Sequence, residues 1–300
     1  MKKKYIFVGD LDSINLELIC KSHPFLKNKV NYLLLGNIID ISKSLKRTKN
    51  RLDLNEIYDP YDFNKFDKNC LNIFNIENVS EEKFKNLLNQ INVGNYLSNV
   101  TNIDLVTLPI NKSVFKKKIP FIGMTEYLSK INNKKTTMLM KGEKFSIIPL
   151  TTHINLKNVN KFINKKNLDD SINEILSQIN KVIYGFNFKK IIFLCVNPHC
   201  SEDETIGEED KVIFNSVSKF NKISGPYAAD SAFKNINQKS LFISMYHDQA
   251  LIPFKILNNK SINLTLGLNY RRISPAHGTA RDIKYKNIAD ISSYMACMEY

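Results

Sequence analysis

The chain has 300 residues, of which 43% are hydrophobic and 24% charged, and its formal net charge is +14. This composition excludes a disordered or collagen-like chain, and the length is sufficient for two domains with cores of their own. No run of about 18 consecutive apolar residues occurs, so the sequence predicts no transmembrane helix and no membrane partner. The apolar run at residues 5–8 is too short for a signal peptide and predicts a first strand.

Charge and cysteine usage indicate the partners and the compartment. Lysine supplies 38 of the 43 positive charges and is scattered along the chain without a basic tail. A genome rich in A/T codons produces such a surface, so we expect no nucleic-acid partner, although a large positive charge is typical of nucleic-acid-binding proteins.

The five cysteines include no Cys-x-x-Cys pair. They are typical of free thiols in a reducing compartment, and we expect a cytoplasmic protein.

Short apolar runs alternate with helical patterns along the chain. The predicted strands cover residues 5–8, 32–35, 71–76, 103–108, 145–150, 191–196 and 241–246. The predicted helices cover residues 80–89, 126–131, 168–182 and 210–220, and Ser80 is the expected N-cap of the first of them. Strands that alternate with helices predict an α/β protein with a mainly parallel sheet.

Glycine placement excludes two common nucleotide-binding devices. None of the ten glycines has Gly-x-Gly spacing, so there is no Rossmann fingerprint, and no Gly-Lys-Ser/Thr occurs, so there is no Walker phosphate loop. A nucleotide cofactor would therefore be bound without either device.

Three of the five histidines end strand-like runs, namely His153, His199 and His247. In open α/β sheets, ligands bind beyond the carboxyl ends of the strands. Three imidazoles delivered to that edge can converge on one divalent cation and leave coordination positions open for substrate. Taken singly, a histidine is more often a hydrogen-bonded structural residue, and this alternative stays open.

Arginine is concentrated near the end of the chain, where three of the five arginines fall within residues 271–281. In a chain that uses lysine for nearly every other positive charge, a retained arginine indicates a need for its planar fork, which binds carboxylate or phosphate. A surface ion pair is the alternative interpretation.

Several short segments, in this order and spacing, match one known family. The most specific segments are Tyr246-His247-Asp248-Gln249 and His277-Gly278-Thr279-Ala280. The others cover residues 107–112, 123–128, 151–156, 197–199, 207–209, 225–233, 253–255 and 263–280. Over nearly its whole length the chain resembles the 4-hydroxythreonine-4-phosphate dehydrogenases, which are enzymes of pyridoxal phosphate biosynthesis.

The resemblance implies a fold like that of the isocitrate and isopropylmalate dehydrogenases, in which two α/β domains with mainly parallel sheets flank an interdomain cleft. The first domain is expected to comprise residues 1–122 plus 282–300. The second domain, residues 123–281, is expected to carry the metal ligands and the dimer interface. The resemblance also implies NAD or NADP as cofactor and a homodimer with its active site at the subunit interface.

The resemblance assigns roles to single residues of this chain. One divalent metal ion, which is zinc, cobalt or magnesium, would be held by His153, His199 and His247 from both subunits. The substrate would be bound by Thr125, Lys255, Asn263 and Arg272. The catalytic group would comprise Lys255, Asp248 and Asp230, with Lys255 or Asp248 as the base. Asp248 is alternatively expected to orient the imidazole of His247.

The implied reaction is the NAD(P)-dependent oxidation of 4-phosphooxy-L-threonine, followed by decarboxylation to 3-amino-2-oxopropyl phosphate. Two alternatives stay open. One is a sister dehydrogenase that acts on a phosphorylated sugar acid such as threonate or erythronate phosphate. The other is a degenerate relative without catalysis.

The sequence departs from the family pattern at four places. The first loop, residues 9–17, lacks three special-geometry residues of the family's glycine-rich loop, and Met124 stands where the family has a histidine. Ala276 replaces an aspartate, and Cys200-Ser201 replaces Ala-Gly. We expect these changes to weaken the activity without abolishing it.

Overall fold

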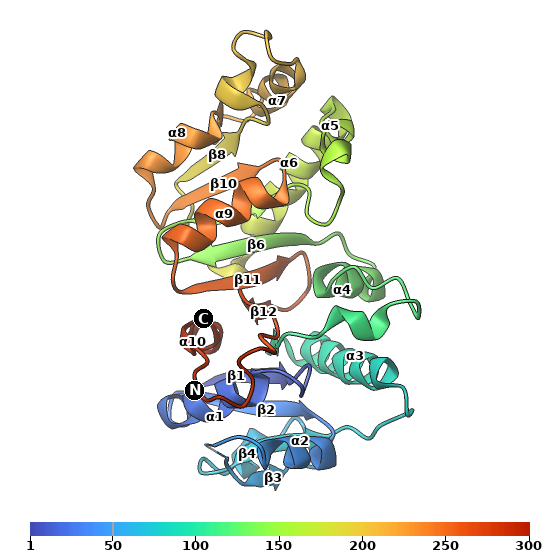
Figure 1. The fold of residues 1–300 in the computed structure, drawn as a ribbon. Helices are drawn as coiled ribbons and strands as arrows, with labels where there is room; N and C mark the ends of the chain where they lie inside the picture. The colour runs from blue at the N-terminus through green and yellow to red at the C-terminus, as the bar shows by residue number, and fades with distance from the viewer. Residues whose placement is uncertain (50) are drawn as a thin grey trace. The chain divides into compact units, whose positions relative to one another are not determined.

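The computed structural model describes residues 1–49 and 51–300, which form two compact units (Figure 1). Unit 1 comprises Met1–Asn133 and Leu268–Tyr300, and unit 2 comprises Lys134–Gly267. The sequence-based boundaries, 1–122 plus 282–300 and 123–281, assign residues 123–133 and 268–281 to the second domain. Both segments pack within unit 1 instead, because Leu128 and Tyr270 belong to its hydrophobic core.

Unit 1 is built on a parallel sheet with the strand order β3-β4-β2-β1-β5-β12. Each strand pairs in parallel with its neighbour. Such sheets are covered on both faces, which explains the continuous apolar runs that predicted them. The strands are β1 (Lys2–Phe7), β2 (Val30–Gly36), β3 (Leu54–Glu56), β4 (Leu71–Asn75), β5 (Asp104–Thr107) and β12 (Arg272–Pro275).

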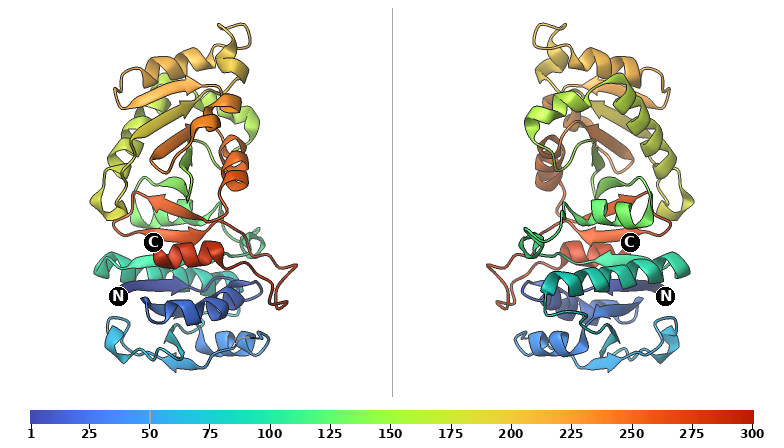
Figure 2. Two further views of the ribbon diagram at one scale, coloured as in Figure 1. Left: turned by 90° about the vertical axis from the view of Figure 1, so that its left-hand side faces the viewer. Right: turned by 90° about the vertical axis from the view of Figure 1, so that its right-hand side faces the viewer.

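Helices cover both faces of this sheet. Helix α3 packs against β1, β2 and β5, whereas α10 packs against β12 and α1. Figure 2 shows α3 and α10 on opposite faces of the sheet of unit 1. The helices of unit 1 are α1 (Asn15–Leu26), α2 (Ile38–Leu45), α3 (Lys83–Thr101), α4 (Met124–Asn132) and α10 (Ser292–Glu299).

Unit 2 has a mixed sheet with the strand order β11-β6-β7-β10-β8-β9. Strands β7, β10, β8 and β9 are parallel, and β6 is antiparallel to both β7 and β11. The strands are β6 (Thr137–Gly142), β7 (Ser146–Pro149), β8 (Lys190–Leu194), β9 (Ile223–Tyr227), β10 (Ser240–Ser244) and β11 (Ser261–Leu266). The helices are α5 (Val159–Phe162), α6 (Lys165–Ile179), α7 (Glu209–Val217), α8 (Ala229–Ala232) and α9 (His247–Leu257).

The predicted α/β class with mainly parallel strands is confirmed. Every predicted strand and helix is present, although the helix predicted at residues 80–89 runs from Lys83 to Thr101. Its predicted N-cap is wrong, because Glu82 occupies the N-cap position while the Ser80 hydroxyl accepts a hydrogen bond from the Glu82 amide. Within the described part of the chain, no helix is both long and apolar enough to cross a membrane.

One buried histidine ties α1 to the sheet of unit 1. His23 is 4% exposed, its Nδ1 contacts the hydroxyl of Tyr32, and its Nε2 lies 2.9 Å from the carbonyl oxygen of Lys68. A carbonyl only accepts, so Nε2 carries the proton and Nδ1 accepts from Tyr32. Burial lowers the pKa of His23, with Lys27 lowering it further and Asp67 opposing the shift.

We expect His23 to make the protein less stable at acid pH. The unfolded chain binds a proton at this site near pH 6.5, whereas the folded chain resists it, so stability falls as the pH drops below that value. The slope is at most about 1.4 kcal/mol per pH unit. Urea unfolding of metal-free protein over a pH series should show a shallower acid slope for His23→Gln. The variant His153→Gln, which replaces an exposed ring, should keep the wild-type slope.

Candidate active site

The three strand-end histidines lie along one edge of unit 2. His153 follows β7, His247 follows β10 and His199 follows β8, and these strands are adjacent and parallel in the order β7-β10-β8. Their carboxyl ends therefore meet at the same edge of the sheet. His247 is the last of these three histidines in the sequence, but it lies between the other two along the edge of the sheet.

His153 and His247 lie close together within one chain. Their ring centroids are 6.2 Å apart, and both rings line an open cavity of about 270 Å³. Thr151 ties the two turns to each other, because its hydroxyl donates to the carbonyl of Met245 at 2.6 Å. Nδ1 of His247 lies 2.6 Å from Oδ1 of Asp248, so this carboxylate holds the orientation of the ring.

His199 lines a neighbouring cavity of about 810 Å³, together with Asp230 and Gln249. Tyr246 and Asp248 line both this cavity and the one beside His153. Among residues 1–49 and 51–300, no group of three histidine, cysteine or acidic side chains is placed to hold a metal ion. One chain thus brings two of the three histidines together and leaves the third on the same edge.

Two further predicted residues of unit 2 line neither of the cavities beside the histidines. Lys255 is exposed on α9, eight residues or about 12 Å along the helix from His247, and lines neither cavity. Asn263 lies on β11, and its Oδ1 is buried with no hydrogen-bond partner among the described residues. An orphaned buried acceptor is costly unless a ligand donates to it.

The remaining predicted substrate residues belong to unit 1. Arg272 is 5% exposed at the start of β12, and its Nε donates to the hydroxyl of Thr107 at 2.8 Å. Burial lowers the pKa of Arg272 to about 10, which leaves the guanidinium charged at neutral pH. Thr125 lies in the first turn of α4, while Met124 packs against the hydrophobic core of unit 1. Met124 is thus a packing residue at the position where the family pattern has a histidine.

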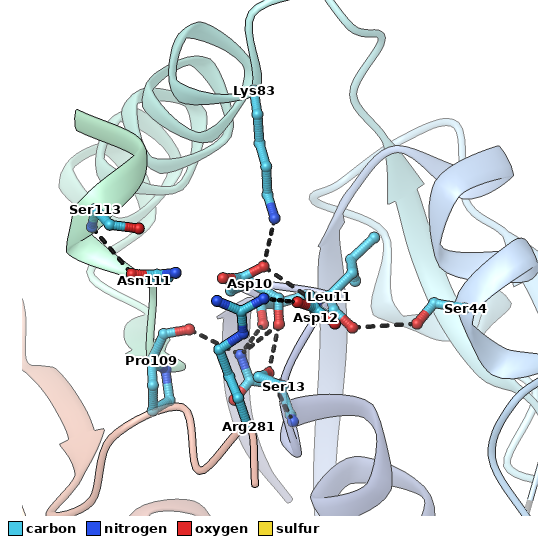
Figure 3. Close-up of polar contacts among 12 residues, drawn as sticks. Asp10, Leu11, Asp12, Ser13, Ser44, Lys83, Pro109, Asn111, Ser113 and Arg281 are labelled. Atoms are coloured by element: carbon cyan, nitrogen blue, oxygen red, sulfur yellow. Dashed lines mark hydrogen bonds and ion pairs between the residues drawn. The ribbon is translucent and has the colours of Figure 1, made fainter. Parts of the chain in front are cut away.

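The altered first loop is held by ion pairs (Figure 3). Lys83 reaches the carboxylate of Asp10 at 2.6 Å. Asp12 is paired with both Arg281 and Lys284 from the segment after β12, and these contacts lower its pKa, Lys284 first. Arg281 therefore contributes to an ion-pair cluster, which is the alternative interpretation that the sequence left open.

The side chain of Asn15 supports the backbone of the same loop. Its Nδ2 donates to the carbonyl oxygens of Val8 and Pro109, each at 2.9 Å. Gly9 has φ +73°, and a Cβ there would lie 2.6 Å from the oxygen of Pro109. The loop thus keeps its first glycine, and a side-chain amide supports the backbone beyond it.

Unit 1 has a cavity of its own that sequence reasoning missed. It measures about 500 Å³ and opens at the carboxyl ends of β1 and β2, beside Val8 and Gly36. Its signal in the sequence is weak, because its polar residues come from four separate segments. The polar lining includes Asn37, Asp40, Lys43, Arg47, Asn78 and Lys83.

The parallel strands and the polar side chains at their carboxyl edges define an α/β enzyme with ligand sites at its strand ends. The family model described as pyridoxal phosphate biosynthetic protein PdxA matches residues 15–300. The chain therefore belongs to this family, that of the 4-hydroxythreonine-4-phosphate dehydrogenases, as the sequence motifs predicted.

Individual relatives agree over their full length. The 4-hydroxythreonine-4-phosphate dehydrogenase of Sulfurihydrogenibium sp. is 32% identical over 315 residues, covering 100% of this chain and 97% of the relative. That of Aquifex aeolicus is 34% identical over 308 residues, covering 97% and 95%. The crystal structure of the Klebsiella pneumoniae enzyme has a TM-score of 0.81 at 24% identity, covering 100% of this chain and 98% of that chain. This last likeness shows the shared fold.

Proposed function

We propose that the protein oxidises 4-phosphooxy-L-threonine with NAD or NADP and decarboxylates the product to 3-amino-2-oxopropyl phosphate, in the pyridoxal phosphate pathway of the cytoplasm. The observation that carries this proposal is the row of three histidines at the carboxyl edge of β7, β10 and β8, in a chain of this family. Five free cysteines fit the reducing compartment.

The donor set at this edge fits a divalent metal ion by its chemistry. Neutral imidazoles suit zinc and cobalt, and Asp248 bonds His247 in the way that carboxylates orient metal-binding histidines. Such a cation would supply Lewis acidity at the substrate hydroxyl. Because one chain does not complete the set, we assign His153, His199 and His247 to a site shared between two copies.

A second copy is also supported by the surface of α9. Ile252 and Ile256 lie one turn apart on this helix and are 58% and 73% exposed. They fall in the same helix as His247 and Lys255, so an interface on this face brings site residues of two subunits together. Exposed apolar patches of this kind mark interaction sites.

The cavity of unit 1 suits one nucleotide half of a nicotinamide cofactor. Its volume of about 500 Å³ falls within the range of ligand pockets, and it lies at strand ends. Asp40 can accept from ribose hydroxyls, whereas Lys43 and Arg47 can bind phosphate. When bound, the cofactor would supply the hydride acceptor.

The polar residues of the chain have distinct proposed roles. Asn263 offers its orphaned oxygen to a donor on the substrate, and Arg272 and Thr125 bind its charged ends. Asp248 is engaged with His247, which favours Lys255 as the base that removes the hydroxyl proton. Asp230 lines the cavity of His199 as a further acid near the reacting groups.

The proposal is tested by assay of purified protein with 4-phosphooxy-L-threonine, supplying NAD or NADP and zinc, cobalt or magnesium in turn. We expect cofactor reduction and carbon dioxide release in equal amounts, and loss of both after chelation. Turnover of threonate or erythronate phosphate alone would favour the sister activity. A folded dimer that binds no metal and reduces no cofactor would identify a non-catalytic relative and contradict the proposal.

A further inference from the structure

The turn that carries His199 has an unusual backbone. Six consecutive residues, 199–204, have φ values between 42° and 71°, and none of them is glycine. This left-handed region is disfavoured for residues that carry a Cβ. Such a turn persists only when its surroundings hold it, and backbone strain of this kind gathers at functional sites.

The carboxylate of Asp210 binds the backbone just before this turn and the Ser201 side chain within it. Asp210 is the second residue of α7 and is 3% exposed. Its Oδ1 accepts from the amide of Val196 at 2.7 Å, and its Oδ2 accepts from the amide of Asn197 at 3.1 Å. Oδ2 also accepts from the hydroxyl of Ser201 at 2.8 Å. These bonds lie on both sides of His199 in the sequence, so one carboxylate fixes the backbone that carries this residue.

The side-chain amides of Asn197 and Gln249 bind further segments at the same edge of the sheet. Nδ2 of Asn197 donates to the carboxylate of Glu209 at 2.9 Å. Gln249 bridges two strand ends, because its Nε2 donates to the carbonyl of Cys195 at 2.7 Å and its Oε1 accepts from the amide of Met245 at 2.8 Å. The turn of His199 is thereby tied to the turn of His247.

Ser201 explains how this chain keeps the turn after losing a glycine. The family pattern has Ala-Gly where this chain has Cys200-Ser201, and Ser201 has φ 68°. Glycine adopts that conformation freely, whereas serine does so at a cost. The buried hydrogen bond from the Ser201 hydroxyl to Asp210, at 2.8 Å, offsets this cost.

We propose that Asp210 is a positioning residue that presents His199 at the edge of the sheet, with Ser201 as its second anchor. The inference rests on the proposed function in one respect, namely that His199 is presented to a divalent cation. Asp210 itself would touch no reacting atom. Its effect on the reaction passes through the orientation of His199.

Two readouts on Asp210→Asn test this role. In metal-free protein, hydrogen exchange of at least one of the Val196 and Asn197 amides should be at least about 10-fold faster, because asparagine replaces one of the two acceptor oxygens with an amide donor. Cobalt affinity, measured by titration of the intact dimer, should fall about 10- to 100-fold, as for other groups that orient metal ligands. Asp210→Glu should restore part of the amide protection and part of the cobalt affinity. The matched control is Asp203→Asn, which removes an exposed carboxylate from the same turn and should change neither.

Exchange and affinity that match the Asp203→Asn control would overturn the inference. If Asp210→Asn fails to fold, Ser201 supplies the test. Ser201→Ala should weaken cobalt binding several-fold, whereas Ser201→Gly should bind like wild type, since glycine adopts the turn without the anchor. Equal affinity of these two variants would contradict the role of Ser201. A wild-type dimer that binds none of cobalt, zinc and magnesium would instead overturn the proposed function, while the exchange measurement would still decide whether Asp210 holds the turn.

Discussion

Replacing any one of His153, His199 and His247 with alanine should lower divalent-cation affinity and turnover by at least about 100-fold. Loss of a group that merely orients a ligand costs about 10- to 100-fold, so loss of the ligand itself should cost more. Calorimetric titration with zinc or cobalt and the cofactor-reduction assay check the two effects. The thermal midpoint of metal-free protein should stay near the wild-type value for His153 and His199, because both rings are exposed.

Mixing pairs of these inactive variants tests whether two copies share the site. When the two changed ligands come from different chains, a mixed dimer keeps one intact site of two. Half of the dimers are mixed after random exchange, so the activity should recover to about one quarter of wild type. Two of the three mixtures should recover, and the histidine variant that these two mixtures share identifies the ligand that the partner supplies. No recovery in any of the three mixtures, despite verified subunit exchange, would contradict a shared site.

Asp104→Asn should destabilise unit 1 by about 3–5 kcal/mol, the usual cost of removing one partner of a buried ion pair. Asp104 receives Lys4 at 2.9 Å and two nitrogens of Arg271 at 2.7 and 2.8 Å. Lys4 is 0% exposed, and burial lowers its pKa. Without Asp104 its ammonium would lack the carboxylate that offsets this burial. Urea unfolding at neutral pH measures the loss.

The surface pair of Asp169 and Lys219 provides the matched control. Its atoms approach to 2.7 Å, but Lys219 is 41% exposed, so Asp169→Asn should cost no more than about 1 kcal/mol. An Asp104→Asn variant as stable as this control would show that the buried pair contributes little. The double change Lys4→Met with Asp104→Leu should recover part of the lost stability, because it removes the buried ammonium but leaves the partly exposed Arg271 without its carboxylate.

The sequence was sufficient to predict the strands whose two faces are buried. Continuous apolar runs predicted β1, β2, β7, β8 and β10, because a parallel strand covered on both sides needs apolar residues at every position. Strands β6 and β11 escaped prediction, since they pair antiparallel and mix polar with apolar residues. Ser80 failed as N-cap because its hydroxyl serves a turn before the helix.

The sequence predicted which histidines lie at the candidate site, but not which other residues hold them in place. The rule that ligands gather at strand ends led to the three histidines from their positions alone. The sequence predicted Asp210 only as the first residue of the helix at residues 210–220. Its role could not be predicted, because the conformation of the turn after β8 decides that Val196 and Ser201 reach its carboxylate. The support of the first loop by Asn15 was likewise unpredictable, because it depends on where a single amide reaches.

The strand order of unit 2 has a consequence for biosynthesis. Strand β10 lies between β7 and β8 but leaves the ribosome after both. Until it inserts, the facing edges of β7 and β8 expose unpaired backbone groups, which are templates for pairing with other nascent chains. The histidine edge therefore forms as a late event of translation, and slow synthesis between residues 195 and 240 would prolong the exposure of these unpaired edges.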